Sequence, residues 1–434
     1  MLDAILAQTR NTALIVGLIA LVGLILQRKS TTDVISGTAK TIIGFMIFNI
    51  GSGFIGGIVT NFTTLFNAAF GIEGVTTQVE VATSMALNTY GTEVALLMLV
   101  GFAANLLFAK FTKYKAIFLT GQHFLYFACV LGLVFIGLGA ATPITVLVGG
   151  LVLGFCGAAL PTLCQKYMNK IVGDDKLAIG HFNCIGYAFS GWIGKLVGKS
   201  SKHPVGEGQH SSDNIKMPKF FSLFRDFIFS IALFMIMLFY VAVIACVMNG
   251  QMALVEEMSG NDIWFVYPML QGLQFAAGMS VLIYGVRQFI AEITASFVGI
   301  SERWIPDAVP AVDCPAIFPF APNAVVIGFV GSFMGGLFGM LLMILFNSSV
   351  IMIPAAGICF FSGGTCGVFG DAYGGWKGAV LSSFIVGIGL VVLPLLLYPA
   401  FTGLGIEGAS FPNVDYNIVG SFIYQIVNFF QNLF

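Results

Sequence analysis

Stretches of about 20 consecutive, mostly apolar residues recur along this chain, and they limit most strongly what it can fold into. They lie near 11–27, 41–62, 93–110, 116–138, 143–163, 226–248, 265–290, 324–346, 349–370, 378–399 and 415–433. Only 9% of the residues are charged, against about 25% in soluble domains. Because so few charges cannot cover a globule, we predict an all-α membrane protein, one polytopic domain over 1–434, with about 11 transmembrane helices.

Glycine is frequent inside several of these stretches. The segment 329–340 reads FVGSFMGGLFGM, and small residues of this kind let helix backbones approach closely within a bilayer. A second segment, NIGSGFIGG at 49–57, contains Ser52. It predicts either a bend that exposes backbone amides or a close-packed helix crossing.

Lysine and arginine orient the predicted spans. Basic residues follow the first, third and fifth spans and precede the sixth, whereas the connections 63–92 and 249–264 carry acids only. Since basic loops stay in the cytoplasm, we predict that the N-terminus lies outside the cell and the C-terminus inside. The first span lacks a basic leader and a small-residue cleavage site, so we expect it to be retained.

Two apolar segments, 177–194 and 307–323, do not read as full spans. Each lies beside the cytoplasmic side and contains one ionisable group, His181 or Asp313. We predict two re-entrant hairpins. If spans 1–5 and 6–10 are repeats, the second begins inside where the first begins outside, which is typical of inverted-topology transporters.

The segment 311–326, AVDCPAIFPFAPNAVV, combines a carboxylate with three prolines. Irregular backbone at membrane depth must be enclosed by protein or line a wet cavity, and a carboxylate within it is usually functional. Asp313 is therefore interpreted as a substrate ligand; the alternative is an N-cap on a re-entrant loop.

The other polar candidates are weaker. His181 could bind a hydroxyl-rich ligand or be a structural histidine. Arg287 and Glu292, in GVRQFIAEI, are predicted to form a structural ion pair. Gln122 and His123, in LTGQHF, could face a cavity or the headgroups, and Glu80 could enter a vestibule or lie on a solvated outer turn.

Motifs for self-contained chemistry are absent from the sequence. We find no GxxxxGK[ST], GxSxG or HExxH, and the 8 cysteines form no CxxC pair. We therefore predict no catalytic residue, cofactor or metal, and the net charge of −1 gives no indication of nucleic-acid binding. The basic loop 195–225 could be a docking surface for a partner protein or only a positive-inside anchor.

Seven motifs in order resemble the ascorbate-type membrane components, enzyme IIC, of the bacterial sugar phosphotransferase system. They are KTIIGFMIFNIGSG (40–53), LTGQH (119–123), AIGH (178–181), GVRQFIAE (285–292), GISERWIP (299–306), AVDCPAIFPFAPNAVV (311–326) and GVFGDAYGGW (367–376). The resemblance covers essentially the whole chain, and the 285–326 block is its most specific part.

The resemblance implies a homodimeric permease whose core moves against a V-shaped scaffold. Such a permease imports L-ascorbate by alternating access, and separate IIA and IIB proteins supply the phosphoryl group during uptake. This chain would be the permease subunit alone, without a IIA or IIB domain and without a phosphorylated residue of its own. The alternative is an ion-coupled secondary transporter with Asp313 as the proton or sodium site.

The resemblance also implies site residues. The family histidine of IGH matches His181, and the family aspartate of the DC motif matches Asp313. Departures occur at Gln122, Tyr126 and Phe182, where the family has histidine, glutamine and glutamine. A family tyrosine falls near Glu80, and Ser52 is included in the predicted pocket. Because a carboxylate such as Glu80 repels an anion, these changes favour a neutral sugar or polyol over ascorbate.

Overall fold

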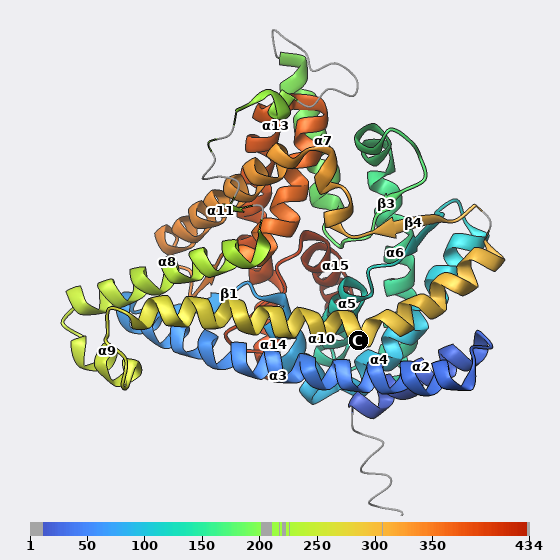
Figure 1. The fold of residues 1–434 in the computed structure, drawn as a ribbon, viewed down its shortest axis with the longest axis horizontal. Helices are drawn as coiled ribbons and strands as arrows, with labels where there is room; N and C mark the ends of the chain where they lie inside the picture. Colours follow the sequence, from blue (N-terminus) through green and yellow to red (C-terminus); the bar gives the residue numbers. More distant parts are fainter. Residues whose placement is uncertain are drawn as a thin grey trace, which may run out of the picture.

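The computed structural model describes residues 12–200, 211–216, 218, 223–224, 226–305 and 307–431. The chain is mostly helical, and long helices alternate with short strands (Figure 1). The α-helices are α2 (Thr12–Leu26), α3 (Thr31–Phe70), α4 (Val79–Phe111), α5 (Gly121–Gly137), α6 (Thr142–Val172), α7 (Cys184–Ser200), α8 (Phe227–Met248), α9 (Met252–Ser259), α10 (Tyr267–Trp304), α11 (Pro322–Leu345), α12 (Ala356–Ile358), α13 (Gly364–Val392), α14 (Tyr398–Thr402) and α15 (Val414–Gln431).

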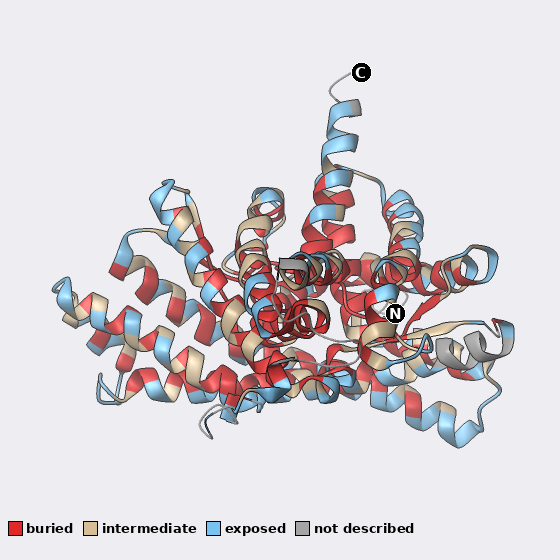
Figure 2. Cartoon of the chain, turned by 90° about the horizontal axis from the view of Figure 1, so that it is seen from above, coloured by how far each residue is buried: buried red, intermediate tan, exposed pale blue. Residues whose placement is uncertain are grey.

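Apolar surface on the outside of these helices identifies a membrane protein. Among the described residues, seven helices are long and apolar enough to cross a bilayer. Large apolar side chains on their outer faces are exposed, for example Ile50, Leu107, Leu151, Val241 and Phe338. Figure 2 shows this pattern as pale outer faces around a buried interior. In water such a surface would be costly, whereas lipid tails solvate it.

The helix bounds differ from the predicted spans in two informative places. The predicted spans 349–370 and 378–399 belong to one apolar run, Ala356–Leu396, which bends at Gly375, where φ is 61° and ψ is −161°. The stretch 116–138 begins as a strand, so its helix is only Gly121–Gly137. Hydropathy measures apolar length and therefore cannot separate a bent helix from two helices, or a strand from a helix.

Within the described ranges, five short strands, which hydropathy did not predict, form two parallel sheets. Strand β1 (Glu73–Thr76) pairs with β5 (Val350–Ile353). Strand β4 (Val309–Val312) lies between β2 (Ala116–Phe118) and β3 (Ala178–Ile179). Strands β1, β2, β3 and β5 are largely buried, whereas β4 is mostly half-buried. Pairing between the strands avoids the cost of unsatisfied backbone groups in an apolar medium.

The predicted close helix crossings at glycines are confirmed. A methyl group on Gly335 would lie 2.0 Å from the carbonyl oxygen of Phe384, and one on Gly331 would lie 2.4 Å from Ser383 Oγ, so α11 and α13 touch along these glycines. In 49–57 the crossing interpretation holds at Gly51, where a methyl group would lie 2.6 Å from the backbone nitrogen of Leu282 in α10. Helix α3 continues through this segment.

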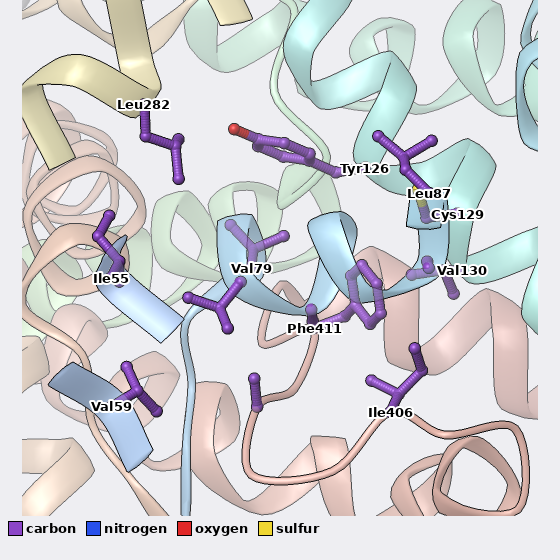
Figure 3. Packing of buried hydrophobic residues seen from close by; sticks show 14 of the residues in the cluster. Ile55, Val59, Val79, Leu87, Tyr126, Cys129, Val130, Leu282, Ile406 and Phe411 are labelled. Carbon is purple, nitrogen blue, oxygen red and sulfur yellow. The ribbon is translucent and has the colours of Figure 1, made fainter. Parts of the chain in front are cut away.

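Two groups of helices pack around the sheets. Helices α2, α3, α8 and α10 contact one another, and Figure 1 shows α3 and α10 side by side across the width of the molecule. Helices α7, α11 and α13 form a second group, and α4, α5 and α6 pack together beside them. Figure 3 shows the buried apolar contacts that join α3, α4, α5 and α10, including Ile55, Val79, Val130 and Leu282.

Candidate functional site

The polar groups of the site follow the carboxyl ends of β2, β4 and β3. Because these strands are parallel, their carboxyl ends meet at one edge, as at ligand sites of parallel sheets. Gln122 and His123 follow β2, Asp313 follows β4, and His181 follows β3. Three segments that are distant in sequence thus bring four polar side chains together.

Asp313 makes several contacts at this edge. Its backbone is extended (φ −70°, ψ 160°), and its Oδ1 accepts a hydrogen bond from the Cys314 amide at 2.8 Å, so it caps the 3₁₀ turn Cys314–Ala316. Its Oδ2 accepts a hydrogen bond from Gln122 Nε2 at 3.2 Å. His123 Nε2 lies 3.6 Å from Oδ1. The N-cap is therefore present, and the same carboxylate also lines a cavity.

The cavity has a volume of about 810 Å³ and lies between α5, α10 and the segment that follows β4. Ligand pockets commonly measure about 300–1,000 Å³. Its polar and charged lining residues are Gln27, Lys29, Thr120, Gln122, Arg287, Thr294 and Asp313. The carboxylate of Asp313 therefore faces a space large enough for a small hydrophilic ligand.

The two histidines are buried in mutual contact. Their ring centroids are 3.8 Å apart, and His181 is fully buried. The hydroxyl of Tyr187 hydrogen-bonds His181 Nδ1 at 2.7 Å and lies 3.4 Å from Cys314 Sγ. This contact fixes the orientation of the His181 ring and ties α7 to the segment that contains Asp313.

Glycines allow the three segments to approach one another. A methyl group on Gly180 would lie 2.3 Å from the Ala311 carbonyl oxygen, and Gly180 donates its amide to Val312 at 2.7 Å. A methyl group on Gly121 would lie 2.0 Å from Ile290 Cγ2 of α10. Any larger residue at either position would separate the groups of the site.

An ion pair at the start of the sheet supports the same arrangement. Lys115 Nζ lies 3.0 Å from Asp307 Oδ2, and the Lys115 carbonyl accepts a hydrogen bond from the Val309 amide at 2.8 Å. The hydrogen bond from Lys115 lowers the pKa of the exposed Asp307 below its usual value. Because solvent screens the ion pair, the backbone hydrogen bond contributes more than the ion pair to holding β2 and β4 together.

Tyr126 and Phe182 pack into the core beside the site. Tyr126 is buried, and its ring meets that of His123 edge-on at 5.4 Å. Figure 3 shows Tyr126 among buried apolar residues. Phe182 is fully buried and stacks on Phe118 of β2, with centroids 4.2 Å apart. Neither side chain is among those that line the cavity.

Glu80 and Ser52 lie elsewhere. Glu80 is half-buried in the first turn of α4. Ser52 lines a separate cavity of about 240 Å³ between α3 and α4, together with Asn49, Ser84 and Asn88. The structure thus does not bring these two predicted residues to the cavity that contains Asp313.

Arg287 and Glu292 occupy different surroundings on α10. Arg287 lines the cavity with Asp313. Glu292 reaches α3, where a methyl group on Gly37 would lie 3.2 Å from its carboxylate carbon. The ion pair between the two residues stays a prediction. Arg287 lies where its side chain can contact a ligand in the cavity.

Tyr187 was given no role in advance, and His123 was named only together with Gln122, as a residue that could face a cavity or the headgroups. Tyr187 stands in an apolar helix, and nothing in IGYAF marks its hydroxyl as a partner of His181. His123 follows Gln122 directly, and sequence order gave no reason to prefer one over the other. The useful signal is the recurrence of a short apolar strand followed by glycine and a polar residue, at 116–123 and 178–181.

Buried strand ends, apolar outer faces and a polar cavity between helices define a multi-pass membrane protein with an internal hydrophilic site. A family model described as the PTS system sugar-specific permease component, EIIC-GAT, matches residues 5–415. The chain therefore belongs to the EIIC-GAT family of sugar-specific permease components, as the seven motifs predicted.

A curated relative agrees with this assignment. The ascorbate-specific PTS system EIIC component of Mycoplasma pneumoniae is 27% identical over 430 residues. The alignment covers 87% of this chain and 63% of that relative. The chain thus spans less than two thirds of the relative's length.

Proposed function

We propose that this chain is the permease subunit of a sugar phosphotransferase system and imports L-ascorbate or a related sugar. The observation that carries the proposal is the cavity with Asp313, Gln122 and Arg287 on its wall, in a chain that belongs to a family of sugar permease components. Paired donors and acceptors of this kind suit a ligand rich in hydroxyl groups.

The strand pairing supports an inverted repeat. In the first half, a long helix leads to β1, then a helix, then β2; in the second half, α10 leads to β4, then a helix, then β5. The first strand of each half pairs with the second strand of the other half. Each first strand also has another neighbour, β3 beside β4 and the bridge between Thr76 and Ala409 beside β1. Such reciprocal pairing of strands between the two halves fits two repeats of opposite orientation.

Alternating access fits the position of the cavity. One wall belongs to α10, which packs with α2, α3 and α8. The other wall belongs to α5 and the segment after β4. Movement of the first helix group, as a scaffold, against the second, as a core, would open and close the cavity.

The cavity is proposed to open toward the cytoplasm. Gln27 and Lys29, which follow α2, lie on its wall, and the positive-inside rule assigns this basic connection to the cytoplasm. With that orientation the N-terminus is outside and the C-terminus inside. A cytoplasmic IIB partner could then reach the sugar from the open side. The central part of the predicted docking loop, 201–210, lies outside the described residues.

The charges on the cavity wall favour an anion over a neutral polyol. The charged residues that line it are Lys29, Arg287 and Asp313, two positive groups against one negative. The sequence argument for a neutral substrate depended on Glu80, which does not line this cavity. Since ascorbate is an anion at neutral pH, we favour L-ascorbate as the substrate.

Uptake by cells that express the chain with its cognate IIA and IIB proteins tests the proposal. We expect labelled L-ascorbate to accumulate as a phosphorylated product only when both partners are present. Arg287→Gln should lower uptake about 10- to 100-fold, because a charge-assisted hydrogen bond contributes about 1.5–3 kcal/mol. Lys377→Gln on the exposed face of α13 is the matched control and should transport normally.

Three outcomes would contradict parts of this proposal. Accumulation of unmodified substrate that collapses when the ion gradient is removed would point to the ion-coupled alternative. Strong competition by neutral polyols, with Arg287→Gln unaffected, would overturn the preference for an anion. A monomer in size-exclusion chromatography with light scattering would remove the homodimer that the family resemblance implies.

A further inference from the structure

Two imidazoles and one carboxylate converge at the carboxyl ends of the central sheet. His123, His181 and Asp313 each present a ligand atom, and these atoms all lie within 4.8 Å of one another. The 3.6 Å between His123 Nε2 and Asp313 Oδ1 is too long for a hydrogen bond. It is close to the edge of a tetrahedral metal site, about 3.3 Å for bonds of 2.0–2.1 Å.

Both imidazoles keep a buried ring nitrogen without a partner among the described residues. These atoms are His123 Nδ1 and His181 Nε2. Leaving a buried donor or acceptor unpaired costs about 1–3 kcal/mol. An unpaired imidazole nitrogen in a cluster with a second imidazole and a carboxylate suggests a ligand that bonds to nitrogen and carries positive charge.

The surrounding hydrogen bonds are those of a supported metal site. A metal-ligating histidine usually engages its second ring nitrogen in a hydrogen bond, which fixes the tautomer. Coordination through His181 Nε2 requires Nδ1–H to donate to the Tyr187 hydroxyl oxygen, which lies 2.7 Å away. Gln122 Nε2 holds the second carboxylate oxygen of Asp313 at 3.2 Å.

The combination of two imidazole nitrogens and one carboxylate oxygen indicates which metal ions can bind here. Magnesium and calcium prefer oxygen ligands alone, whereas imidazole nitrogen suits zinc and other first-row transition metals. Three protein ligands also leave a fourth position for water or a ligand oxygen. Asp313 lines the cavity, so this position is within reach of a molecule held there.

We propose that His123, His181 and Asp313 bind one divalent transition-metal ion, with Zn²⁺ as the probe. The ligand atoms, which lie within 4.8 Å of one another, need to approach by at most about 1.5 Å to reach tetrahedral distances. The ion would neutralise the carboxylate and satisfy a buried nitrogen on His181. The proposal stands apart from the proposed function, because metal binding is measured on purified protein without transport.

Metal content of the purified protein tests this site. The chain is prepared in detergent with a tag free of histidine, stripped with chelator and dialysed against Zn²⁺ alone. We expect about one Zn²⁺ per chain, and a Co²⁺-loaded sample should show the intense visible absorption of a tetrahedral site. His181→Gln and Asp313→Asn should each weaken Zn²⁺ binding about 100-fold or more, since loss of a supporting partner alone costs 10–100-fold.

Two further variants make the test specific. Tyr187→Phe keeps the buried ring and removes only the hydroxyl, so it should fold and weaken Zn²⁺ binding about 10-fold. The double variant His203→Gln with His210→Gln removes the other histidines of the sequence and should bind Zn²⁺ normally. The proposal is overturned if the wild-type chain binds no Zn²⁺ above background. It is also overturned if binding persists in His181→Gln or disappears in the double variant.

Discussion

Asp313 shows how one side chain can serve a turn and a cavity together. One oxygen caps the turn at Cys314, and the other accepts a hydrogen bond from Gln122. The cap holds the carboxylate at the strand end, and the second hydrogen bond directs it toward α5. The structural and functional interpretations of this residue therefore do not exclude one another.

Asp313→Asn separates the two roles. The amide oxygen can still accept from the Cys314 amide, so we expect the free energy of unfolding to change by no more than about 1 kcal/mol. The amide group, however, presents a donor where Gln122 donates, and the negative charge is lost. Uptake should fall about 10- to 100-fold, which corresponds to the 1.5–3 kcal/mol of a charged hydrogen bond.

The matched control for this change is Asp307→Asn, a carboxylate in the same connection that is largely exposed. Its uptake and its thermal unfolding in detergent should resemble those of the wild type. Normal transport by Asp313→Asn would show that the aspartate acts only as a cap.

Among the elements, α13 illustrates how a single residue decides the course of a helix. Its backbone bends at Gly375, where φ is 61° and ψ is −161°. This region is essentially restricted to glycine, because a Cβ would collide with the backbone. The bend lets one apolar run contain two differently directed segments.

Gly375→Ala should destabilise the protein by about 1–3 kcal/mol, the usual cost of a residue held in a forbidden backbone region. Thermal unfolding in detergent, followed by circular dichroism, measures the effect. Gly389→Ala in the same helix is the control, since its methyl group would meet only Leu393 Cδ1 at 3.7 Å. Equal melting temperatures for both variants would show that the bend does not depend on glycine.

At the scale of the whole molecule, strands of the first half pair with strands of the second half, but the residues that directly follow these strands differ. Asp313 follows β4, whereas Thr77 follows β1 in the corresponding place and bonds the Ile353 carbonyl at 3.0 Å. The arrangement of strands is thus similar on both sides, whereas the residue directly after the first strand is charged in one half and neutral in the other. The cavity with Asp313 lies between α10 of one helix group and α5 of the other helices.

Cysteine labelling tests which side of the membrane the cavity faces. All eight native cysteines are buried, so their background labelling should be low. Ala295→Cys, on the cavity wall, should react with a membrane-impermeant thiol reagent in inside-out vesicles. Glu257→Cys, in the predicted external connection, should react only in right-side-out vesicles. Reversed labelling of the two positions would overturn the proposed orientation.

The sequence predicted individual polar residues better than their grouping. His181 and Asp313 were chosen because an ionisable group in an apolar segment is costly, and both lie at the strand ends. Gln122, which was chosen from the LTGQH motif, also lies at a strand end. Ser52 and Glu80 were assigned to the same pocket, but no local pattern reports which face of a long helix turns toward a given cavity.

Apolar length and charge distribution determined that this chain is a helical membrane protein, because the cost of exposing or burying side chains is a property of each segment. Motif order likewise determined the family. Only the tertiary structure decided that three short strands bring His123, His181 and Asp313 together, and that the apolar run 356–396 bends at Gly375. These features depend on hydrogen bonds and close packing between residues far apart in sequence, and composition does not record such contacts.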